Sequence, residues 1–317
     1  MAAKLAFSDL VAKIQNKNIS RKEIGLYFVA DEARSRPFAP ALVLNPSTVD
    51  IAGIERSARA AAPALAAEAS VAAKSGRLTT RKRKTAVAAQ PTIVAEGDSW
   101  FNLPDIIYPD TIVDILQINY SIANIAMYGD ELEHMILLAE YMPYLANGNV
   151  DFLMFSGGGN DVIGGGALAN CINLYDPDHT NPKQAAYYIN AEFEKALSRI
   201  DQLYRSLAAQ VRKISPATKI VVHGYDYAIP RHEGQFLGKA LQVRGLDPAW
   251  DGPLCDAIIA MMINRFNDRL QKLPSDNVIY VDLRGTAGNV GGWFDELHPN
   301  AATARRMAKK FAKVLAA

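Results

Sequence analysis

Short apolar runs alternate with longer stretches of helical periodicity from Pro91 to the end of the chain. Each run is rich in Val, Ile or Phe and lacks a clean two-residue alternation, which is typical of strands buried on both faces of a parallel sheet. The runs that predict strands are residues 92–96, 121–127, 151–155, 219–223 and 278–282. We therefore expect a five-stranded parallel sheet.

Helical periodicity lies between and after these strands. The predicted helices cover residues 130–142, about 184–213, 254–272 and 300–316. A chain that alternates strands and helices in this way folds as α/β, with helices covering both faces of the sheet. The pattern predicts a three-layer α/β/α sandwich.

Two connections are longer than an ordinary loop, residues 162–183 and residues 225–253. Both follow predicted strand ends, and open α/β sheets bind their ligands at that edge. We expect these two connections to form the walls of a substrate pocket.

The first ninety residues follow a different pattern. Residues 1–52 predict a helical N-terminal extension, because Phe7, Leu10 and Ile14 share a helical face and Ser20 precedes Glu23 at capping-box spacing. Residues 53–90 are rich in alanine and then basic, which indicates a linker or an exposed helix. Residues 91–317 form the third predicted segment, an α/β domain. The extension is interpreted as an oligomerisation arm, a cap over the cleft or a delivery segment.

Composition and charge narrow the class of protein. The chain has 317 residues, of which 50% are hydrophobic and 21% charged, as expected for a globular domain with an appendage. Lysine and arginine number 34 against 33 acidic residues, so the net charge of +1 gives no general attraction to nucleic acid or to an anionic membrane.

The cysteines and the first residues indicate the compartment. Cys171 and Cys255 are too few for a disulfide framework and have no C-x-x-C spacing, so two buried thiols are expected. The first ten residues lack the apolar core of a secretory signal, and no eighteen apolar residues run together. A cytoplasmic location is the expectation, with non-classical export left open.

The first motif with chemical potential is Gly97-Asp98-Ser99-Trp100, directly after the first predicted strand. Ser99 is then expected at the carboxyl end of that strand, where the chain turns toward a helix and a hydroxyl can face a cleft. The alternative is that Asp98 or Ser99 only caps the next helix.

The second motif is Gly158-Gly159-Asn160-Asp161, after the strand at residues 151–155. Glycines there let the Asn160 amide approach a reacting centre, where it can donate to an oxyanion. A phosphate loop is disfavoured because neither G-x-x-x-x-G-K-[ST] nor G-x-G-x-x-G is present in register. A plain Asn-Asp turn is the alternative.

The third motif is Asp295-Glu296-Leu297-His298-Pro299, just before the last predicted helix. A tight turn there brings the Asp295 carboxylate to Nδ1 of His298 and leaves Nε2 free to act. The other four histidines, His134, His179, His223 and His232, are expected to lack such a partner at that spacing and to be structural or surface residues. Gly129, in the segment from Asn124 to Asp130, offers a backbone N–H as a second oxyanion donor, or is a simple turn glycine.

With these elements in this order, the sequence resembles the SGNH hydrolases, the superfamily that includes the GDSL-type esterases and lipases. The resemblance covers about residues 91–317. Its blocks are Gly97-Asp98-Ser99, Asn124 through Gly129-Asp130, Gly158-Gly159-Asn160-Asp161, and Asp295 with His298-Pro299. Trp100 stands where the GDSL name has leucine, a change expected to affect the pocket rather than the chemistry.

The resemblance implies a role for each residue. Ser99 is the nucleophile, His298 the general base and then acid, and Asp295 the group that fixes the imidazole tautomer. Ser99 N–H, Gly129 N–H and the Asn160 amide form the oxyanion hole, with Gly97 and Asp98 in support. The implied fold is a flavodoxin-like α/β/α sandwich, and no metal or organic cofactor is implied. The sequence lacks the G-x-S-x-G of the α/β-hydrolase elbow.

The expected function is a serine esterase that hydrolyses carboxylic esters through an acyl-enzyme. Short-chain or carbohydrate-linked acyl esters are favoured because no apolar lid helix stands out. A lysophospholipase or thioesterase with the same residues is the alternative, and a non-catalytic module that binds a glycan or a protein is another. Nucleic-acid binding through the basic residues 74–84 is disfavoured, since no aromatic residues are interleaved with them. The oligomeric state is left open.

Overall fold

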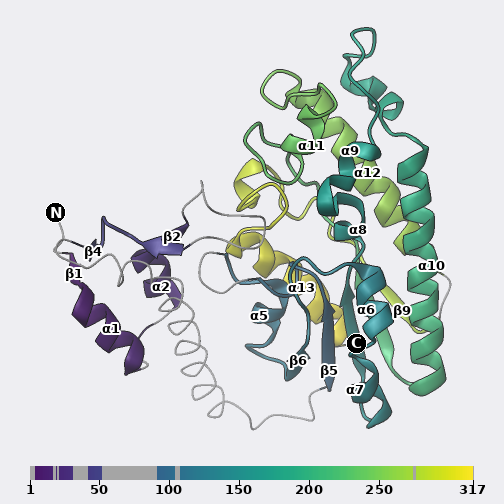
Figure 1. Cartoon of the computed structure of the whole chain (residues 1–317). Coiled ribbons are helices and arrows are strands. Elements are labelled where there is room, and N and C mark those ends of the chain that lie inside the picture. The colour runs from purple at the N-terminus through teal and green to yellow at the C-terminus, as the bar shows by residue number, and fades with distance from the viewer. Residues whose placement is uncertain are drawn as a thin grey trace. The chain divides into compact units, whose positions relative to one another are not determined.

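The computed structural model describes residues 4–16, 19, 21–30, 42–51, 91–103, 108–273 and 276–316 (Figure 1). The predicted alanine-rich and basic segment, residues 53–90, lies outside the described residues. The chain divides into an N-terminal unit and a larger unit that comprises residues 90–103 and 109–317. Each unit is described by itself.

The larger unit is built on a parallel sheet of five strands in the order β6-β5-β7-β8-β9. The strands are β5 (Ile93–Gly97), β6 (Ile122–Asn124), β7 (Phe152–Ser156), β8 (Lys219–His223) and β9 (Val278–Val281). The predicted α/β fold with a five-stranded parallel sheet is confirmed. Strand β6 ends at Asn124, three residues before the predicted boundary.

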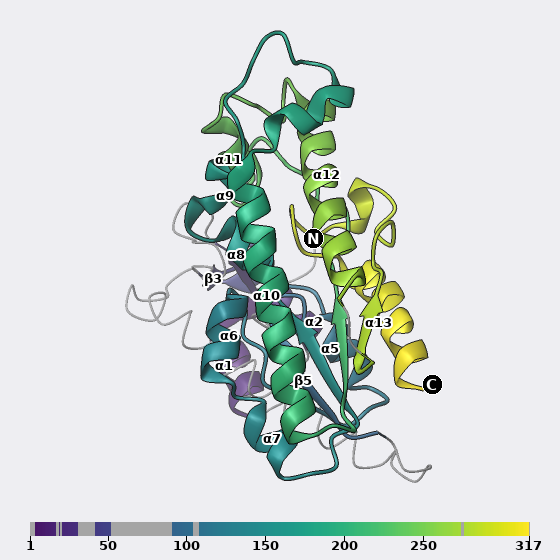
Figure 2. The same ribbon diagram turned by 90° about the vertical axis from the view of Figure 1, so that its right-hand side faces the viewer.

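Helices cover both faces of this sheet (Figures 1 and 2). The α-helices are α5 (Ile112–Leu116), α6 (Leu132–Leu138), α7 (Met142–Ala146), α8 (Gly159–Ile163), α9 (Ala167–Asn170), α10 (Ala191–Ile214), α11 (Gly238–Gln242), α12 (Gly252–Gln271) and α13 (Ala301–Leu315). The 3-10 helices are η1 (Gly164–Gly166), η2 (Pro182–Tyr188) and η3 (Val290–Gly292). The arrangement is the predicted three-layer sandwich.

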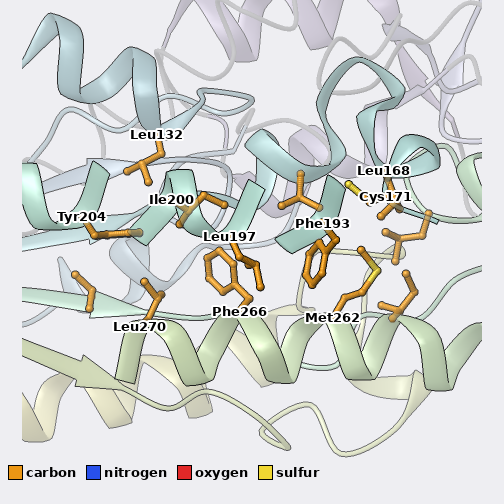
Figure 3. Close-up of a cluster of buried hydrophobic side chains, with 14 of the residues drawn as sticks. Leu132, Leu168, Cys171, Phe193, Leu197, Ile200, Tyr204, Met262, Phe266 and Leu270 are labelled. Atoms are coloured by element: carbon orange, nitrogen blue, oxygen red, sulfur yellow. The ribbon is translucent and has the colours of Figure 1, made fainter. Parts of the chain in front are cut away.

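Alternate side chains of each strand enter different cores. On β5, Val94 packs into the core formed with α6, α7, α10 and α12, whereas Ile93 and Ala95 pack into the core formed with α5 and α13. Figure 3 shows the first core, where Phe193 and Leu197 of α10 face Met262 and Phe266 of α12. Burial on both faces explains why these strands read as continuous apolar runs in the sequence.

The N-terminal unit has its own small core, with Leu10, Ile24, Phe28 and Val49 among its buried side chains. The predicted helices are present as α1 (Phe7–Gln15) and α2 (Arg21–Tyr27), and a strand begins directly after α2 at Phe28. Four short strands also occur here, which the helical periodicity did not indicate. They are β1 (Leu5–Ala6), β2 (Phe28–Ala30), β3 (Leu42–Leu44) and β4 (Val49–Asp50).

No helix in the described ranges combines the length and the apolar composition needed to cross a membrane.

Candidate active site

The site lies at the carboxyl edge of the sheet, where the strand order reverses. Strand β5 pairs with β6 on one side and with β7 on the other, so the turns that follow β5 and β7 lie next to each other. Gly97, the last residue of β5, is opposite Ser156 in this register, and Asp98 N–H donates to the Ser156 carbonyl at 3.0 Å. Ser99 and the turn that carries Asn160 are therefore neighbours, as open α/β sheets place ligand-binding groups.

The Asp98 carboxylate fixes the turn that presents Ser99. Its Oδ1 accepts the Trp100 N–H at 3.0 Å and the Ser156 hydroxyl at 2.7 Å, and its Oδ2 accepts the Tyr225 hydroxyl at 2.5 Å. Asp98 is 2% exposed, and a buried carboxylate needs such donors. The cap alternative for Asp98 and Ser99 is wrong, because the next helix, α5, is capped by Thr111 and begins only at Ile112.

A tight turn after η3 places Asp295 against His298. Trp293 and Pro299 pair in an antiparallel bridge, and Phe294 N–H donates to the His298 carbonyl at 2.8 Å. Asp295 Oδ1 accepts the backbone N–H of Leu297 at 2.9 Å and that of His298 at 2.7 Å. The Asp295 side chain thus stabilises the turn that brings it against His298.

Ser99, His298 and Asp295 form a continuous chain of contacts. His298 Nε2 lies 3.0 Å from Ser99 Oγ, and His298 Nδ1 lies 2.7 Å from Asp295 Oδ2. Burial raises the pKa of Asp295, but the hydrogen bonds and charge of His298 outweigh it, so the pKa is below its usual value. An ionised carboxylate can only accept, so Nδ1 carries the proton and Nε2 has its lone pair directed at the Ser99 hydroxyl.

The sequence predicts three N–H donors for an oxyanion, namely the backbone N–H groups of Ser99 and Gly129 and the side-chain amide of Asn160. The Asn160 amide donates one hydrogen to the Asp130 carbonyl at 2.8 Å, which leaves its second hydrogen for an acceptor in the cleft. Gly129 has a φ of 79°, a turn conformation that favours glycine, so Gly129 lies in a turn between β6 and α6 rather than at the strand end. Within the described parts of the chain, the Ser99 and Gly129 N–H groups have no protein acceptor.

A pocket with an empty volume of about 720 Å³, open solvent at its mouth included, extends from Ser99 and Asn160. Most side chains that line it away from the catalytic groups are apolar, namely Val162, Ile163, Leu168, Phe193, Ala228, Leu237, Ile259, Met262, Ile263, Phe266 and Leu297. Both long connections contribute, through Leu168 and Leu237 for example, and α10, α12 and Leu297 of the His298 turn supply the rest. Phe193, Met262 and Phe266 are seen between these two helices in Figure 3.

The family model that matches this chain is the GDSL-like Lipase/Acylhydrolase family, over residues 94–306. The chain belongs to this family. It therefore shares the family's ester-hydrolase class, while its own substrate is a separate question.

Solved structures similar to this GDSL-like acylhydrolase include three lipolytic enzymes. An extracellular lipase from Streptomyces rimosus is 15% identical with a TM-score of 0.49, over 70% of this chain and 99% of the other. Phospholipase A1 from Streptomyces albidoflavus is 18% identical with a TM-score of 0.48, over 71% and 99%. The lipase Lip_vut3 from a goat rumen metagenome is 15% identical with a TM-score of 0.46, over 71% and 97%. A search among curated proteins finds no match.

Two residues that hold the site together were not singled out as site residues by the sequence. The Tyr225 hydroxyl donates to Asp98 and accepts the Gly159 N–H at 3.0 Å, so it joins the turns after β5 and β7. Burial, with the nearby Asp98 charge, raises the pKa of Tyr225 well above its usual value and keeps this hydroxyl a donor. The second is Glu296, inside the Asp295-to-His298 motif. The only sequence signal for Tyr225 is its place two residues after β8.

One of the other histidines of this acylhydrolase, His179, differs from the expectation. His134, His179 and His232 each contact an aspartate, and Asp176 precedes His179 at the same spacing of three as in Asp295 and His298. His298 and His223 are both completely buried, and the contact with Ser99 distinguishes His298. No group of three or more His, Cys, Asp or Glu side chains arranged to hold a metal ion occurs among the described residues.

Proposed function

We propose that this protein is a serine esterase that hydrolyses carboxylic esters through an acyl-enzyme on Ser99. The observation that carries the proposal is the contact chain from Ser99 Oγ to His298 Nε2, 3.0 Å, and from His298 Nδ1 to Asp295 Oδ2, 2.7 Å. A serine hydroxyl is a weak nucleophile by itself, and an adjacent base with an oriented partner activates it.

In the first half-reaction, Ser99 Oγ attacks the ester carbonyl carbon while His298 Nε2 takes its proton. The carbonyl oxygen becomes an oxyanion that accepts hydrogen bonds from Ser99 N–H, Gly129 N–H and the Asn160 amide. Collapse of the tetrahedral intermediate breaks the bond to the alcohol oxygen, which leaves with the proton from His298. The acid part of the ester then remains on Ser99.

In the second half-reaction, water replaces the alcohol. His298 Nε2 takes a proton from the water as its oxygen attacks the acyl carbon. Collapse of the second tetrahedral intermediate breaks the bond between the acyl carbon and Ser99 Oγ, which receives the proton from His298, and the carboxylic acid is released. Throughout, Asp295 holds the imidazole in the tautomer with Nδ1–H and stabilises the imidazolium that forms twice in each cycle.

Covalent labelling tests the nucleophile. A fluorophosphonate probe is expected to label the wild type on Ser99 and to leave Ser99→Ala unlabelled. Labelling that persists in Ser99→Ala would move the nucleophile to another residue. A wild type that is neither labelled nor active on a broad panel of esters would instead support the non-catalytic binding module.

The pocket favours an apolar acyl group and hence the lysophospholipase or thioesterase alternative over short-chain or carbohydrate-linked esters. Apart from the proposed catalytic groups, the carboxylates that line the pocket are committed within the protein: Asp98 to three donors, and Asp226 to the N–H groups of Tyr227, Gly285 and Ala287. Sugar hydroxyls need polar partners, whereas an alkyl chain gains by leaving water.

A series of aryl esters with acyl chains from acetyl to dodecanoyl tests this preference. Each methylene that enters the apolar pocket is expected to raise kcat/KM about fourfold, which corresponds to ~0.8 kcal/mol per buried CH₂. An acetyl ester as the best substrate would restore the short-chain proposal. Hydrolysis rates measured side by side on a lysophospholipid and on an acyl thioester would then decide between a lysophospholipase and a thioesterase.

A further inference from the structure

Glu296, which lies between Asp295 and His298 in the sequence, binds a distant segment of the chain. Its side chain is 2% exposed and its two oxygens accept four backbone N–H groups. Oε1 accepts from Arg231 at 2.9 Å and Gly238 at 2.8 Å, and Oε2 from Phe236 at 2.8 Å and Leu237 at 3.0 Å. The Glu296 carbonyl also accepts the Ile229 N–H at 3.1 Å. Residues 229–238 therefore wrap around one buried carboxylate.

The closeness of this packing is visible at Gly234. A Cβ built on Gly234 would lie 1.9 Å from Cδ of Glu296, far inside van der Waals contact. The segment therefore passes directly over the carboxylate, and only a residue without a side chain fits there. Four N–H donors compensate for the loss of water around the charge.

The segment that Glu296 holds has two contacts with the site. Leu237, whose N–H binds Oε2, lines the apolar pocket. Phe236, whose N–H binds the same oxygen, packs edge-on against the His298 ring, with centroids 5.7 Å apart at 81°. The neighbouring Asp295 carboxylate faces His298 instead. Of the two successive carboxylates in this turn, Asp295 therefore orients the imidazole and Glu296 binds the pocket wall.

We infer that Glu296 is a positioning residue that couples residues 229–238 to the His298 turn, so that one carboxylate sets both the pocket wall at Leu237 and the packing of His298. The inference rests on the proposed esterase function. Its consequence is a split in the kinetics. Loss of the Leu237 wall weakens binding of long acyl chains, whereas loosening of His298 slows turnover of every ester.

The test compares Glu296→Gln with Glu233→Gln. The first replaces one acceptor oxygen by an NH₂ group that faces N–H donors, and the second makes the same charge change at an exposed position of the same segment. In Glu296→Gln we expect KM for a decanoyl ester to rise about tenfold, from the lost burial of one leucine. KM for the acetyl ester is expected to stay unchanged, and kcat to fall by a similar factor for both esters. Glu233→Gln is expected to match the wild type.

Hydrogen exchange provides a readout that does not depend on activity. The amides of residues 231, 236, 237 and 238 are expected to exchange faster in Glu296→Gln and at the wild-type rate in Glu233→Gln. If the wild type fails to hydrolyse esters or to react with fluorophosphonate, the proposed function fails, and this exchange result still shows whether Glu296 holds the segment.

Gly234→Ala repeats the perturbation from the other side, because its methyl group displaces the Glu296 carboxylate without changing its charge. The same split between KM and kcat is expected. An equal loss of kcat/KM on the decanoyl and acetyl esters, or no loss, in whichever of the two variants folds would overturn the inference. Failure of both variants to fold would also overturn it, since Glu296 would then serve the fold rather than the site.

Discussion

Asp98, one residue before the proposed nucleophile, is the centre of a buried hydrogen-bond network. It receives hydrogen bonds from Trp100, Ser156 and Tyr225, which belong to the turn after β5, to β7 and to the segment after β8. These donors lie in or directly after three different strands of the sheet. The position of Ser99 therefore depends on the strand register as well as on its own turn. A mutation at Tyr225 is therefore expected to act on the site from a distance in sequence.

Tyr225→Phe is expected to destabilise the protein by about 1.5–3 kcal/mol, the usual range for a hydrogen bond to a charged group. It removes the donor to Asp98 Oδ2 and the acceptor of the Gly159 N–H together. Urea denaturation measures the change. Tyr227→Phe is the matched control, since its hydroxyl contacts Asn264 at an exposed position and its loss is expected to cost much less. Equal losses in the two variants would show that the Asp98 network carries no special stability.

Asn160→Ala is expected to lower kcat on an aryl ester on the order of a hundredfold to a thousandfold, the usual cost of one oxyanion donor. The reason is the second amide hydrogen, which Asp130 does not use. Steady-state kinetics at saturating substrate measure it. Asn173→Ala removes a comparable bond to a backbone carbonyl, that of Tyr187, far from Ser99 in sequence, and is expected to leave kcat intact. A loss below about threefold in Asn160→Ala would contradict the oxyanion role.

Sequence motifs identified the residues that the structure brings together at the site, but not the residues that hold them. Ser99, Asn160 and His298 lie in short strings with chemical meaning, so their types and spacing suffice to select them; their catalytic roles stay predictions. Tyr225 contacts the Asp98 carboxylate and the Gly159 N–H, and the Glu296 carboxylate contacts backbone N–H groups of residues 231–238. All of these partners are far away in sequence. No local pattern records which N–H groups a buried glutamate will meet.

At the scale of elements, the strands were predictable because each is buried on both faces and therefore wholly apolar. The long helices α10, α12 and α13 were predictable because several turns repeat their pattern. Helices α5, α8, α9 and α11 have four or five residues, too few for a helical period to be recognised. The strands of the N-terminal unit have two or three residues, which is likewise too few for a strand pattern to be recognised.

Strand β5 contains a buried acid whose titration is expected to affect folding. Glu96 is 3% exposed, and burial raises its pKa from 4.5 to about 8 despite a hydrogen bond from Gly97 N–H at 2.9 Å. Between pH 4.5 and about 8 the unfolded chain releases this proton while the folded chain keeps it. This group's contribution to the unfolding free energy is therefore fully present below pH 4.5 and is lost as pH rises through about 8.

Glu96→Gln is expected to remove this loss, because the amide stays neutral and its oxygen can still accept the Gly97 N–H. Relative to wild type, the variant is expected to gain stability on the order of a few kcal/mol at pH 8 and little at pH 4.5. Denaturant titrations at several pH values measure the difference. Glu233→Gln makes the same change at an exposed site whose charge does not contribute to the pKa of Glu96, and is expected to show no such pH dependence. A gain that is constant with pH would contradict the burial argument.

At the scale of the whole molecule, the candidate site is complete within the larger unit. Ser99, Gly129, Asn160, Asp295 and His298 all belong to it, as do the residues that line the pocket. The N-terminal unit has a separate apolar core around Leu10 and Phe28. Among the described residues, neither core includes side chains of the other unit, so each core has the means to form by itself.

A chain of residues 91–317 is therefore expected to fold and to react with fluorophosphonate at Ser99. Its hydrolysis of an acetyl aryl ester is expected to stay close to the rate of the full chain, because every proposed catalytic group remains. Light scattering on both chains measures whether removal of the extension changes the mass in solution, and thus whether it is an oligomerisation arm. Ser99→Ala in the shortened chain is the control for labelling. A shortened chain with a native circular dichroism spectrum but no labelling would mean that the extension contributes to the site, as the cap interpretation requires.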